Sequence, residues 1–564
     1  MKHLLFAACM ALLSSYAAAD WQVGTITETR RVGRAEAPGK ALAVSLEAAG
    51  NEWEGFQVLL RSDKPVAGVG LEMGDLKGPG GAVIPAKGCR LYRQHQFEIT
   101  DPTFRNKEFK PGWYPDALIP FAHPLTGEAL TGARFQAVPF DLPANETHGF
   151  WVDVFVPAGT AAGEYRGVCR VTRKDGPAKE IPVTVKAWGF DLPATPAMRT
   201  ALGWPADRLR GYYAKLAKEG KAEAPKDWAS VEAQCAELLS RHRINATPPA
   251  DIKRPAAQAD GSYAFSPAQV KALREWVDRY HVNAIPMDHP RSVVKDLEKE
   301  KDKLRAWLKA FDQLARDLDR PGVAFYTYLK DEPNKKEEYE YVQQWGKAVK
   351  EAKSALKVLV VEQTKTQNPE WGDLYGAVDI WCALFPLHDD TTARERMALG
   401  EEVWTYTALC QREPATPFWQ TDYPLLNYRV PAWQAWRFGI TGILYWGGMA
   451  YWSGVQDPWM DPKTLDRRNP PAGKPNPLYL YNGDGSILYP GRDAGYDGVA
   501  ASLRLKALRD AIEDYDYLAL LDKAGKKEQA LKVVLGVAQD WFKWDHNPAA
   551  YLKAREKLAG MLVK

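Results

Sequence analysis

Two adjacent carboxylates, Asp331 and Glu332, follow an apolar run that has the composition of a β-strand. The run 323–329 is β-branched and aromatic, which favours a strand. Asn334, three residues before Glu337, is typical of an N-cap with its capping box, and predicts that a helix follows. The acidic pair therefore falls between a strand and the next helix, where parallel α/β barrels build their active sites. The simpler interpretation is an acidic, solvated turn.

The elements around this pair predict such a barrel. From residue 197 onward, short β-branched runs alternate with amphipathic helical patterns, as in a parallel sheet. Eight strands over about 250 residues are the usual size of a (β/α)8 barrel. The predicted strands span 199–204, 244–248, 283–287, 323–329, 358–362, 378–384, 403–409 and 442–446. The acidic pair then ends the fourth strand.

The rest of the chain predicts two flanking regions and a targeting segment. Short alternating strands, punctuated by glycine and proline, predict a β-sandwich over residues 20–196. The barrel spans 197–465, and residues 466–564 carry a hairpin signal at 480–491 and three helical patterns, near 501–523, 528–541 and 548–562, that are expected to pack on the barrel. Residues 1–19 have the charged start, apolar stretch and small-residue cleavage site of a signal peptide. We therefore expect an exported protein, periplasmic or extracellular.

Composition excludes several classes of protein. The formal charge of +3 has no polybasic run, so neither nucleic acid nor an anionic membrane is an expected partner. No later apolar stretch is long enough to span a membrane. The cysteines are too sparse for a disulfide framework, and no cysteine or histidine spacing fits zinc. Nucleotide-binding glycine motifs are absent. No cofactor and no metal is predicted.

Carboxylates in an aromatic site suggest cleavage of glycosidic bonds, which usually requires an acid and a base or nucleophile. In common retaining barrels the acid follows strand four and the nucleophile ends strand seven. Here Glu401 and Glu402 lie at the amino end of strand seven, and its carboxyl end has no carboxylate. Asp331 is then the natural partner of Glu332. Neighbouring side chains on a strand point to opposite faces, so the pair converges only where the strand breaks, as Pro333 encourages.

Aromatic residues supply the candidate sugar-binding surfaces. The chain has 21 tryptophans, nine of them between 371 and 459. Indoles suit the C–H faces of sugar rings, although core packing explains about half of them. Trp446 is predicted to form the floor of the site, with Trp204 or Tyr406 as a wall; a buried core role is the competing interpretation. The substrate-binding candidates are Trp446, Tyr406, Trp204, Tyr328, Trp381, Trp404, Trp419 and Asp422.

Several of these segments together resemble glycoside hydrolase family 123, the β-N-acetylgalactosaminidase family and its relatives. The resemblance covers nearly all of the mature chain. The segments are NEWEGFQV at 51–58, YLKDEP at 328–333, FWQTDYP at 418–424, RVPAWQAWRFG at 429–439, GILYW at 442–446 and SLRLKALRDAIEDY at 502–515.

The resemblance implies an enzyme that removes β-linked 2-acetamido sugars from glycans or glycolipids. The acetamido oxygen of the substrate would attack the anomeric carbon, Glu332 would act as acid and then base, and Asp331 would orient the acetamide. The residues leave two alternatives open. One is a glycosidase for another sugar, with Asp422 or Glu362 as base or nucleophile, and the other is a non-catalytic carbohydrate-binding protein.

Overall fold

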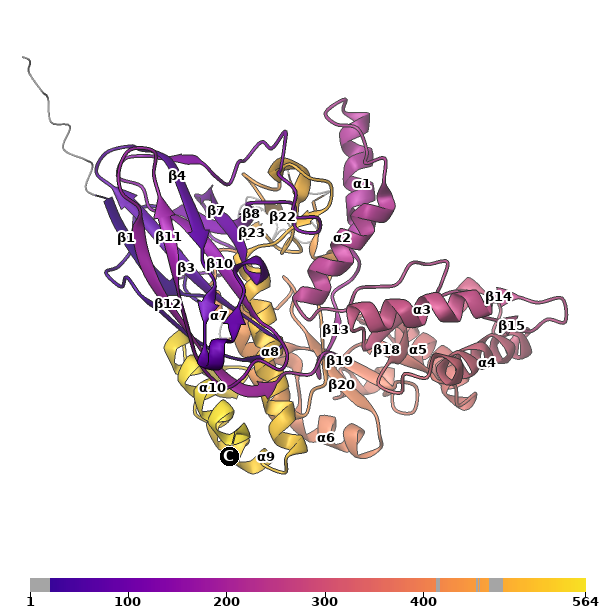
Figure 1. Ribbon diagram of the computed structural model, residues 1–564. Helices are drawn as coiled ribbons and strands as arrows, with labels where there is room; N and C mark the ends of the chain where they lie inside the picture. The colour runs from indigo at the N-terminus through magenta and orange to yellow at the C-terminus, as the bar shows by residue number, and fades with distance from the viewer. Residues whose placement is uncertain (1–20, 412–415, 453–454, 456, 466–479, 564) are drawn as a thin grey trace, which may run out of the picture.

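The computed structural model describes residues 21–411, 416–452, 455, 457–465 and 480–563. The predicted signal peptide at 1–19 and the start of the predicted C-terminal region, 466–479, lie outside the described residues. Two assemblies of elements stand side by side in Figure 1: a β-rich part built from the first strands of the chain and a parallel barrel with its helices. The C-terminal helices lie between and beneath them.

The β-rich part is a sandwich of two mainly antiparallel sheets. One sheet has the order β1 (Trp21–Thr27), β3 (Glu52–Ser62), β10 (His148–Val156), β7 (Arg90–Ile99) and β8 (Gly112–Pro120). The other has the order β2 (Val44–Gly50), β12 (Lys179–Asp191), β11 (Gly163–Thr172), β4 (Val66–Met73) and β9 (Phe140–Leu142), with β5 (Leu76–Lys77) and β6 (Val83–Ile84) at its side. In β12 every second residue from Ile181 to Ala187 is buried, the period that a strand with one covered face requires.

The barrel sheet contains seven parallel strands among the described residues. In spatial order they are β13 (Arg199–Ala201), β21 (Gly442–Leu444), β20 (Glu402–Tyr406), β19 (Ile380–Leu384), β18 (Leu356–Val361), β17 (Ala324–Asp331) and β16 (Ala284–Met287). The predicted fold class, a sandwich followed by a TIM-like barrel with a C-terminal helical part, is confirmed. The barrel is nearly closed rather than fully closed by an eighth strand.

The strand predicted at 244–248 does not form. Its place between β13 and β16 is taken by side-chain hydrogen bonds centred on Asn245. The Asn245 side-chain amide donates to the Thr200 carbonyl (3.0 Å) and to Asn283 Oδ1 (2.9 Å), and its own Oδ1 accepts from the Asn283 backbone N–H (2.9 Å). The segment thus connects β13 to Asn283, the residue before β16, through side-chain hydrogen bonds and not through a backbone ladder, a difference that the apolar pattern does not reveal.

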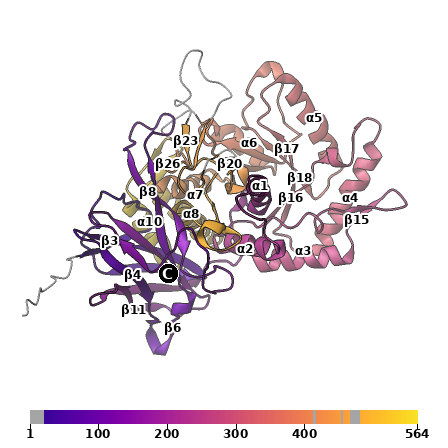
Figure 2. The ribbon, with the colours of Figure 1, turned by 90° about the horizontal axis from the view of Figure 1, so that it is seen from above.

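Helices connect most of the barrel strands, and several of them lie along the outside of the barrel (Figures 1 and 2). They are α1 (Pro205–Lys218), α2 (Trp228–Arg241), α3 (Pro267–Tyr280), α4 (Lys301–Leu318), α5 (Lys336–Glu351), α6 (Asp390–Ala398) and α7 (Leu426–Phe438). In α4 the buried residues Leu304, Leu308 and Phe311 recur at helical spacing, so one apolar face packs on the sheet. No helix among the described residues has the length and apolar character needed to cross a membrane.

The C-terminal region corrects two sequence predictions. Residues 480–491 do not form one hairpin: β23 (Leu480–Asn482) pairs with β22 (Lys463–Leu465), and β24 (Tyr489–Pro490) pairs with β25 (Val499–Ala500). The helix expected over 528–541 is shorter. It is α9 (Lys527–Leu535), and the strands β26 (Ala538–Asp540) and β27 (Lys543–Trp544) follow it. Helices α8 (Leu503–Lys523) and α10 (Pro548–Leu562) agree with the prediction.

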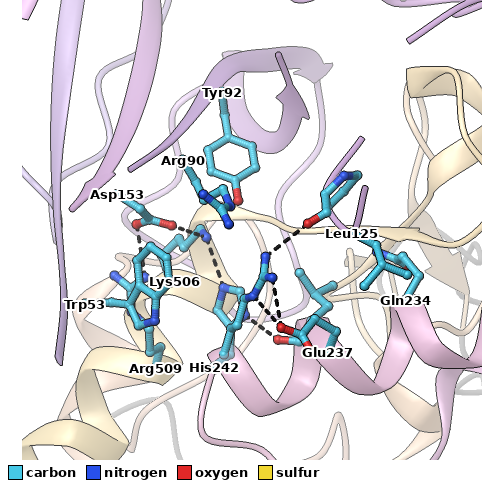
Figure 3. A pocket seen from close by; sticks show the side chains of 13 residues that line it. Trp53, Arg90, Tyr92, Leu125, Asp153, Gln234, Glu237, His242, Lys506 and Arg509 are labelled. Atoms are coloured by element: carbon cyan, nitrogen blue, oxygen red, sulfur yellow. Dashed lines mark hydrogen bonds and ion pairs between the residues drawn. The ribbon is translucent and has the colours of Figure 1, made fainter. Parts of the chain in front are cut away.

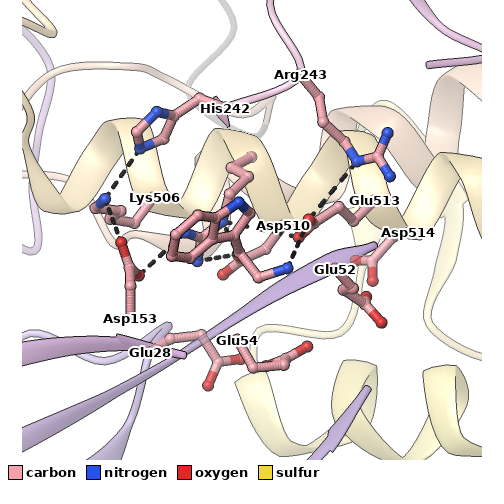
Figure 4. A network of polar contacts seen from close by, with 12 residues as sticks. Glu28, Glu52, Glu54, Asp153, His242, Arg243, Lys506, Asp510, Glu513 and Asp514 are labelled. Carbon is pink, nitrogen blue, oxygen red and sulfur yellow. Dashed lines mark hydrogen bonds and ion pairs between the residues drawn. The ribbon is translucent and has the colours of Figure 1, made fainter. Parts of the chain in front are cut away.

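Helix α8 joins the sandwich to the barrel through buried charges. Asp153 of β10 accepts hydrogen bonds from Lys506 (2.5 Å) and Arg509 (3.0 Å) of α8, and Lys506 also bonds to His242 (3.0 Å) after α2. A cavity of only about 20 Å³, room for about one water, lies among these groups (Figure 3). Further along α8, Glu513 faces Arg243, which follows α2, in the same network (Figure 4). The two halves are therefore fastened by complementary charge as well as by apolar packing.

Candidate active site

A cavity of about 930 Å³ lies at the carboxyl end of the barrel strands. The last residues of five strands line it: Ala201 of β13, Asp331 of β17, Val361 of β18, Tyr406 of β20 and Leu444 of β21. This is the end at which the loops of a parallel barrel can carry side chains without disturbing the sheet. Both carboxylates of the acidic pair, Asp331 and Glu332, face this cavity.

Two departures from regular strand geometry let these neighbours share one cavity. The pairing of β17 with β18 shifts register between Tyr328 and Lys330, so one extra residue is inserted in β17. Glu332 then adopts a left-handed backbone conformation with φ of 39°, which is uncommon outside glycine. Its N–H still donates to the Val361 carbonyl (3.1 Å), so the strained residue is held by β18. The strand break predicted at Pro333 therefore begins earlier, within β17.

Each carboxylate accepts a hydrogen bond from a tyrosine. The Tyr328 hydroxyl donates to Asp331 Oδ1 (2.7 Å), and the Tyr406 hydroxyl donates to Glu332 Oε1 (2.5 Å). Burial, together with the neighbouring carboxylate, raises the pKa of both tyrosines well above the ordinary value. Both hydroxyls therefore remain protonated and act as donors. The Cys410 thiol lies 3.6 Å from the same Glu332 oxygen.

The loop after Glu332 is tied down by amide side chains. Asn334 Nδ2 donates to the Glu332 carbonyl (2.7 Å), and Gln367 Nε2 donates to Asn334 Oδ1 (2.9 Å). The predicted capping role of Asn334 is therefore wrong, because its side chain serves the preceding loop and α5 begins after Lys335. Glu338, not Glu337, reaches back to accept from the Asn334 N–H (2.8 Å).

Four of the predicted aromatic residues line the cavity: Trp446, Trp204, Tyr328 and Tyr406. Trp446 is half-buried, and its ring packs against Tyr451 with centroids 4.8 Å apart. A Cβ at Gly485 would lie 2.8 Å from the Trp446 ring, so a glycine is needed beneath the indole. The indole is thus supported from behind and open toward the cavity.

The other four substrate-binding candidates lie outside the cavity. Trp381, Trp404 and Trp419 are buried, and their indole N–H groups donate to Glu401, Glu402 and the Asn427 carbonyl, respectively. These residues pack the core.

Asp422 is also buried and lies outside the cavity. Its carboxylate accepts from the Thr103 N–H (2.8 Å), the Thr103 hydroxyl (2.5 Å) and the Asn106 amide (3.0 Å) of the sandwich. Asp422 therefore links the barrel to the sandwich.

Several cavity residues were not predicted. Asp207 and Arg208 come from the first turn of α1, and Tyr451 and Thr464 come from the segments after β21. Asp207 could have been predicted, because it follows the first predicted strand and so lies at the carboxyl end of the barrel. The other three carry no local pattern that sets them apart. Among the described residues, no three acidic, histidine or cysteine side chains are grouped as a metal site requires.

Glu362, one of the alternative bases, follows β18 and faces a second cavity that adjoins the first. Its side chain is 5% exposed. Burial, with a smaller contribution from the Glu332 carboxylate, raises the pKa of Glu362 to about 8. Glu362 is therefore protonated at neutral pH.

Comparisons with known proteins bear on this site. The family model for the catalytic domain of glycoside hydrolase 123 matches residues 272–521, and the model for the glycoside hydrolase 123 N-terminal domain matches residues 34–173. The catalytic match includes Asp331, Glu332, Tyr406 and Trp446. No curated protein sequence matches this chain.

One solved structure shares the fold of this chain. A family 123 glycoside hydrolase from Clostridium perfringens, analysed for glycolipid glycan hydrolysis, is 12% identical with a TM-score of 0.64, over 96% of this chain and 97% of that one. A glycosyl hydrolase family 2 member from Bacteroides cellulosilyticus is 11% identical over 77% of this chain and 52% of that one, with a TM-score of only 0.24. The two family models together cover more than half of the sequence, and the chain belongs to glycoside hydrolase family 123.

Proposed function

We propose that this glycoside hydrolase removes terminal β-linked 2-acetamido sugars, of the N-acetylgalactosamine type, from glycans or glycolipids. The substrate itself supplies the nucleophile. The observation that carries the proposal is the convergence of Asp331 and Glu332 on one cavity, each carboxylate held by a tyrosine hydroxyl.

In the first step the acetamido oxygen attacks the anomeric carbon, while Glu332 protonates the departing glycosidic oxygen. The bond to the leaving group breaks, and a positively charged oxazolinium forms. The Asp331 carboxylate accepts the acetamide N–H and stabilises the developing positive charge. Glu332, now ionised, then removes a proton from the water that opens the ring at the same carbon. Two displacements at one carbon retain its configuration.

The other described carboxylates fit the role of nucleophile less well. Glu362 is neutral at neutral pH and faces the adjoining cavity, and Asp422 is enclosed by Thr103 and Asn106. Asp207 is exposed on α1 and is the remaining described carboxylate that lines the main cavity. A glycosidase for a sugar without an acetamido group would have to use a residue such as Asp207. Family membership favours a hydrolase over a non-catalytic carbohydrate-binding protein.

A panel of aryl glycosides followed by two inhibitors tests this proposal. We expect p-nitrophenol release from β-linked 2-acetamido sugars, inhibition by a thiazoline that mimics the oxazoline, and weaker thiazoline binding by Asp331→Asn. The proton NMR spectrum of the first product is expected to be that of the β-anomer. Covalent labelling of a carboxylate by a 2-fluoro sugar, with no thiazoline inhibition, would instead identify a protein nucleophile and disprove substrate assistance.

We further propose that the enzyme acts outside the cytoplasm. The support is the signal-peptide pattern of residues 1–19. Amino-terminal sequencing of the protein recovered from the periplasmic or culture fraction should begin near Asp20. Recovery of the intact amino terminus from the cytoplasm alone would contradict this.

A further inference from the structure

A second cavity of about 790 Å³ adjoins the first at the same end of the barrel. Its volume, like that of the main cavity, is within the range of pockets that bind small molecules. Four residues line both cavities: Glu332, Val361, Tyr406 and Cys410. The proposed general acid and its hydrogen-bonding tyrosine thus form part of the wall between them.

A general acid that cleaves a glycosidic bond must lie beside the bridging oxygen. The sugar to be removed is then on one side of it and the leaving group on the other. Asp331 and Tyr328 line the main cavity and are not part of the lining of the second one. The acetamido sugar that Asp331 orients therefore occupies the main cavity, and the leaving group extends past Glu332 into its neighbour.

We propose that the second cavity is the leaving-group subsite, and that it binds the sugar residue to which the cleaved sugar is attached. This inference rests on the proposed function, because it takes Glu332 as the acid. It makes the enzyme selective for a saccharide leaving group, in addition to the terminal sugar.

The walls of this cavity suit a sugar ring. Asn334, Gln363 and Gln367 present amide groups, which can both donate to and accept from hydroxyls. Leu387 and Phe542 are 47% and 49% exposed, so both present apolar surface to the cavity that they line. An apolar pair of this kind can cover the C–H face of a sugar ring.

The apolar pair is held in position although its members come from distant parts of the chain. Leu387 ends a short helical turn after β19, and Phe542 lies between β26 and β27. Two nearby rings stack: Phe385, two residues before Leu387, and Trp541, next to Phe542, have centroids 4.6 Å apart with an angle of 10° between their planes, and both are buried. A C-terminal element far from the catalytic strands in sequence thereby completes the cavity.

Glu362 adds a hydrogen-bond donor to this subsite. It lines the cavity beside Gln363, whose backbone N–H donates to Glu362 Oε1 (3.2 Å). Because Glu362 is protonated at neutral pH, its other oxygen can carry a proton and donate to a hydroxyl of the leaving sugar. An ionised carboxylate could only accept.

Comparing two substrates isolates this subsite. The β-fluoride of N-acetylgalactosamine has a leaving group of one atom, whereas the 1,3- and 1,4-linked disaccharides with galactose have a full sugar. The measured quantity is the ratio of kcat/KM for the preferred disaccharide to kcat/KM for the fluoride. We expect the double variant Leu387→Ala/Phe542→Ala to lower this ratio about tenfold or more. The reason is that the variant loses the apolar surface that both side chains bury against the leaving sugar.

Leu399→Ala is the matched control, because Leu399 is 68% exposed and lies on the C-terminal end of α6, away from both cavities. It should leave the ratio at the wild-type value. An unchanged ratio in the double variant would overturn the subsite assignment, whether the two rates fall together or stay the same.

Failure of the proposed function has a different signature. In that case the wild type hydrolyses neither substrate, and the aryl panel identifies the correct sugar. The same comparison is then made with the fluoride of that sugar and its disaccharide. If no sugar is turned over, binding of a sulfur-linked N-acetylgalactosaminyl-galactose is measured by calorimetry. Equal affinity of the wild type and the double variant for this probe also overturns the proposal.

Discussion

The hydroxyl of Tyr406, the last residue of β20, donates a hydrogen bond of 2.5 Å to Glu332 Oε1 across the barrel end from β17. In a retaining barrel the seventh strand normally ends in the nucleophile; here the corresponding strand ends in a tyrosine that donates to Glu332, the proposed acid. The carboxylates of that strand, Glu401 and Glu402, lie at its other end and accept from buried indoles. A tyrosine in place of the carboxylate at the end of this strand is consistent with the proposal that the substrate supplies the nucleophile.

The first prediction concerns Glu332. Glu332→Gln should lower kcat on natural glycans by roughly 10²–10⁴-fold, the usual contribution of one general acid or base. Aryl substrates with good leaving groups should lose less, because their departing oxygen requires little protonation. The control is Glu337→Gln, an exposed residue of the following helix, with melting temperatures recorded for both variants. Near-normal turnover of a natural glycan by folded Glu332→Gln would remove Glu332 from the mechanism.

The second prediction separates a sugar platform from a core tryptophan. Trp446 lines the cavity and is half-buried, whereas Trp452 is 1% exposed and donates to the Leu488 carbonyl (3.0 Å). Trp452→Ala should cost about 3–5 kcal/mol of stability. Trp446→Ala should cost clearly less, but should weaken thiazoline binding by about tenfold or more, since a large apolar contact is lost.

Thermal unfolding and inhibitor titration at low temperature distinguish the two roles. If Trp446→Ala unfolds as readily as Trp452→Ala and still binds inhibitor normally, the indole belongs to the core.

The parts of the fold that could be predicted are those set by local pattern. Strand runs and helical periodicity identified seven barrel strands and placed the acidic pair after the fourth predicted strand. The failure at 244–248 has a physical cause: successive side chains there alternate between buried and half-buried as in a strand, but Asn245 bonds to its neighbours through its side chain. Sequence alone does not tell a backbone ladder from a side-chain bridge.

The candidate site was predicted only in part, for a similar reason. Trp381, Trp404 and Trp446 each fall within a predicted barrel strand, and composition does not distinguish them. What differs is a partner remote in sequence, such as Glu401 for Trp381 or the glycine at 485 beneath Trp446. Segments that complete the two cavities, such as the turn with Phe542, also come from elements whose position depends on tertiary packing.

The third prediction uses the pH dependence of Glu362. Its pKa is about 8 in the fold and 4.5 as an ordinary glutamate. Between these values the unfolded chain is ionised and the folded chain is not, so the free energy of unfolding falls as pH rises through this window. Glu362→Gln keeps the shape and cannot ionise. It should be more stable than the wild type at pH 9, with the difference shrinking toward pH 4.5.

Melting temperatures at pH 5, 7 and 9 test this, with the exposed Glu370→Gln as control. A difference between Glu362→Gln and the wild type that does not change with pH would show that Glu362 titrates normally in the folded protein.

The fourth prediction concerns the joint between sandwich and barrel. Asp153 lies opposite Lys506 and Arg509, and all three are buried. Burial alone raises the pKa of Asp153, but Arg509 and Lys506 outweigh it and hold the pKa well below its usual range. A lowered pKa means that the stability from this carboxylate is present above the unfolded pKa, near 4, and is lost as pH falls below it.

Asp153→Asn leaves two buried cations without their counter-charge. Breaking a buried pair in this way costs about 3–5 kcal/mol, more than an exposed pair because the stranded charges are out of reach of water. Denaturant unfolding at pH 7 should show this loss, and the gap from the wild type should narrow in acid. Asp175→Asn, an exposed aspartate of the same sandwich, is the control and should unfold like the wild type. If Asp153→Asn matches the wild type at pH 7, the ion cluster does not hold α8 to the sandwich, and the apolar contacts around it must carry that role.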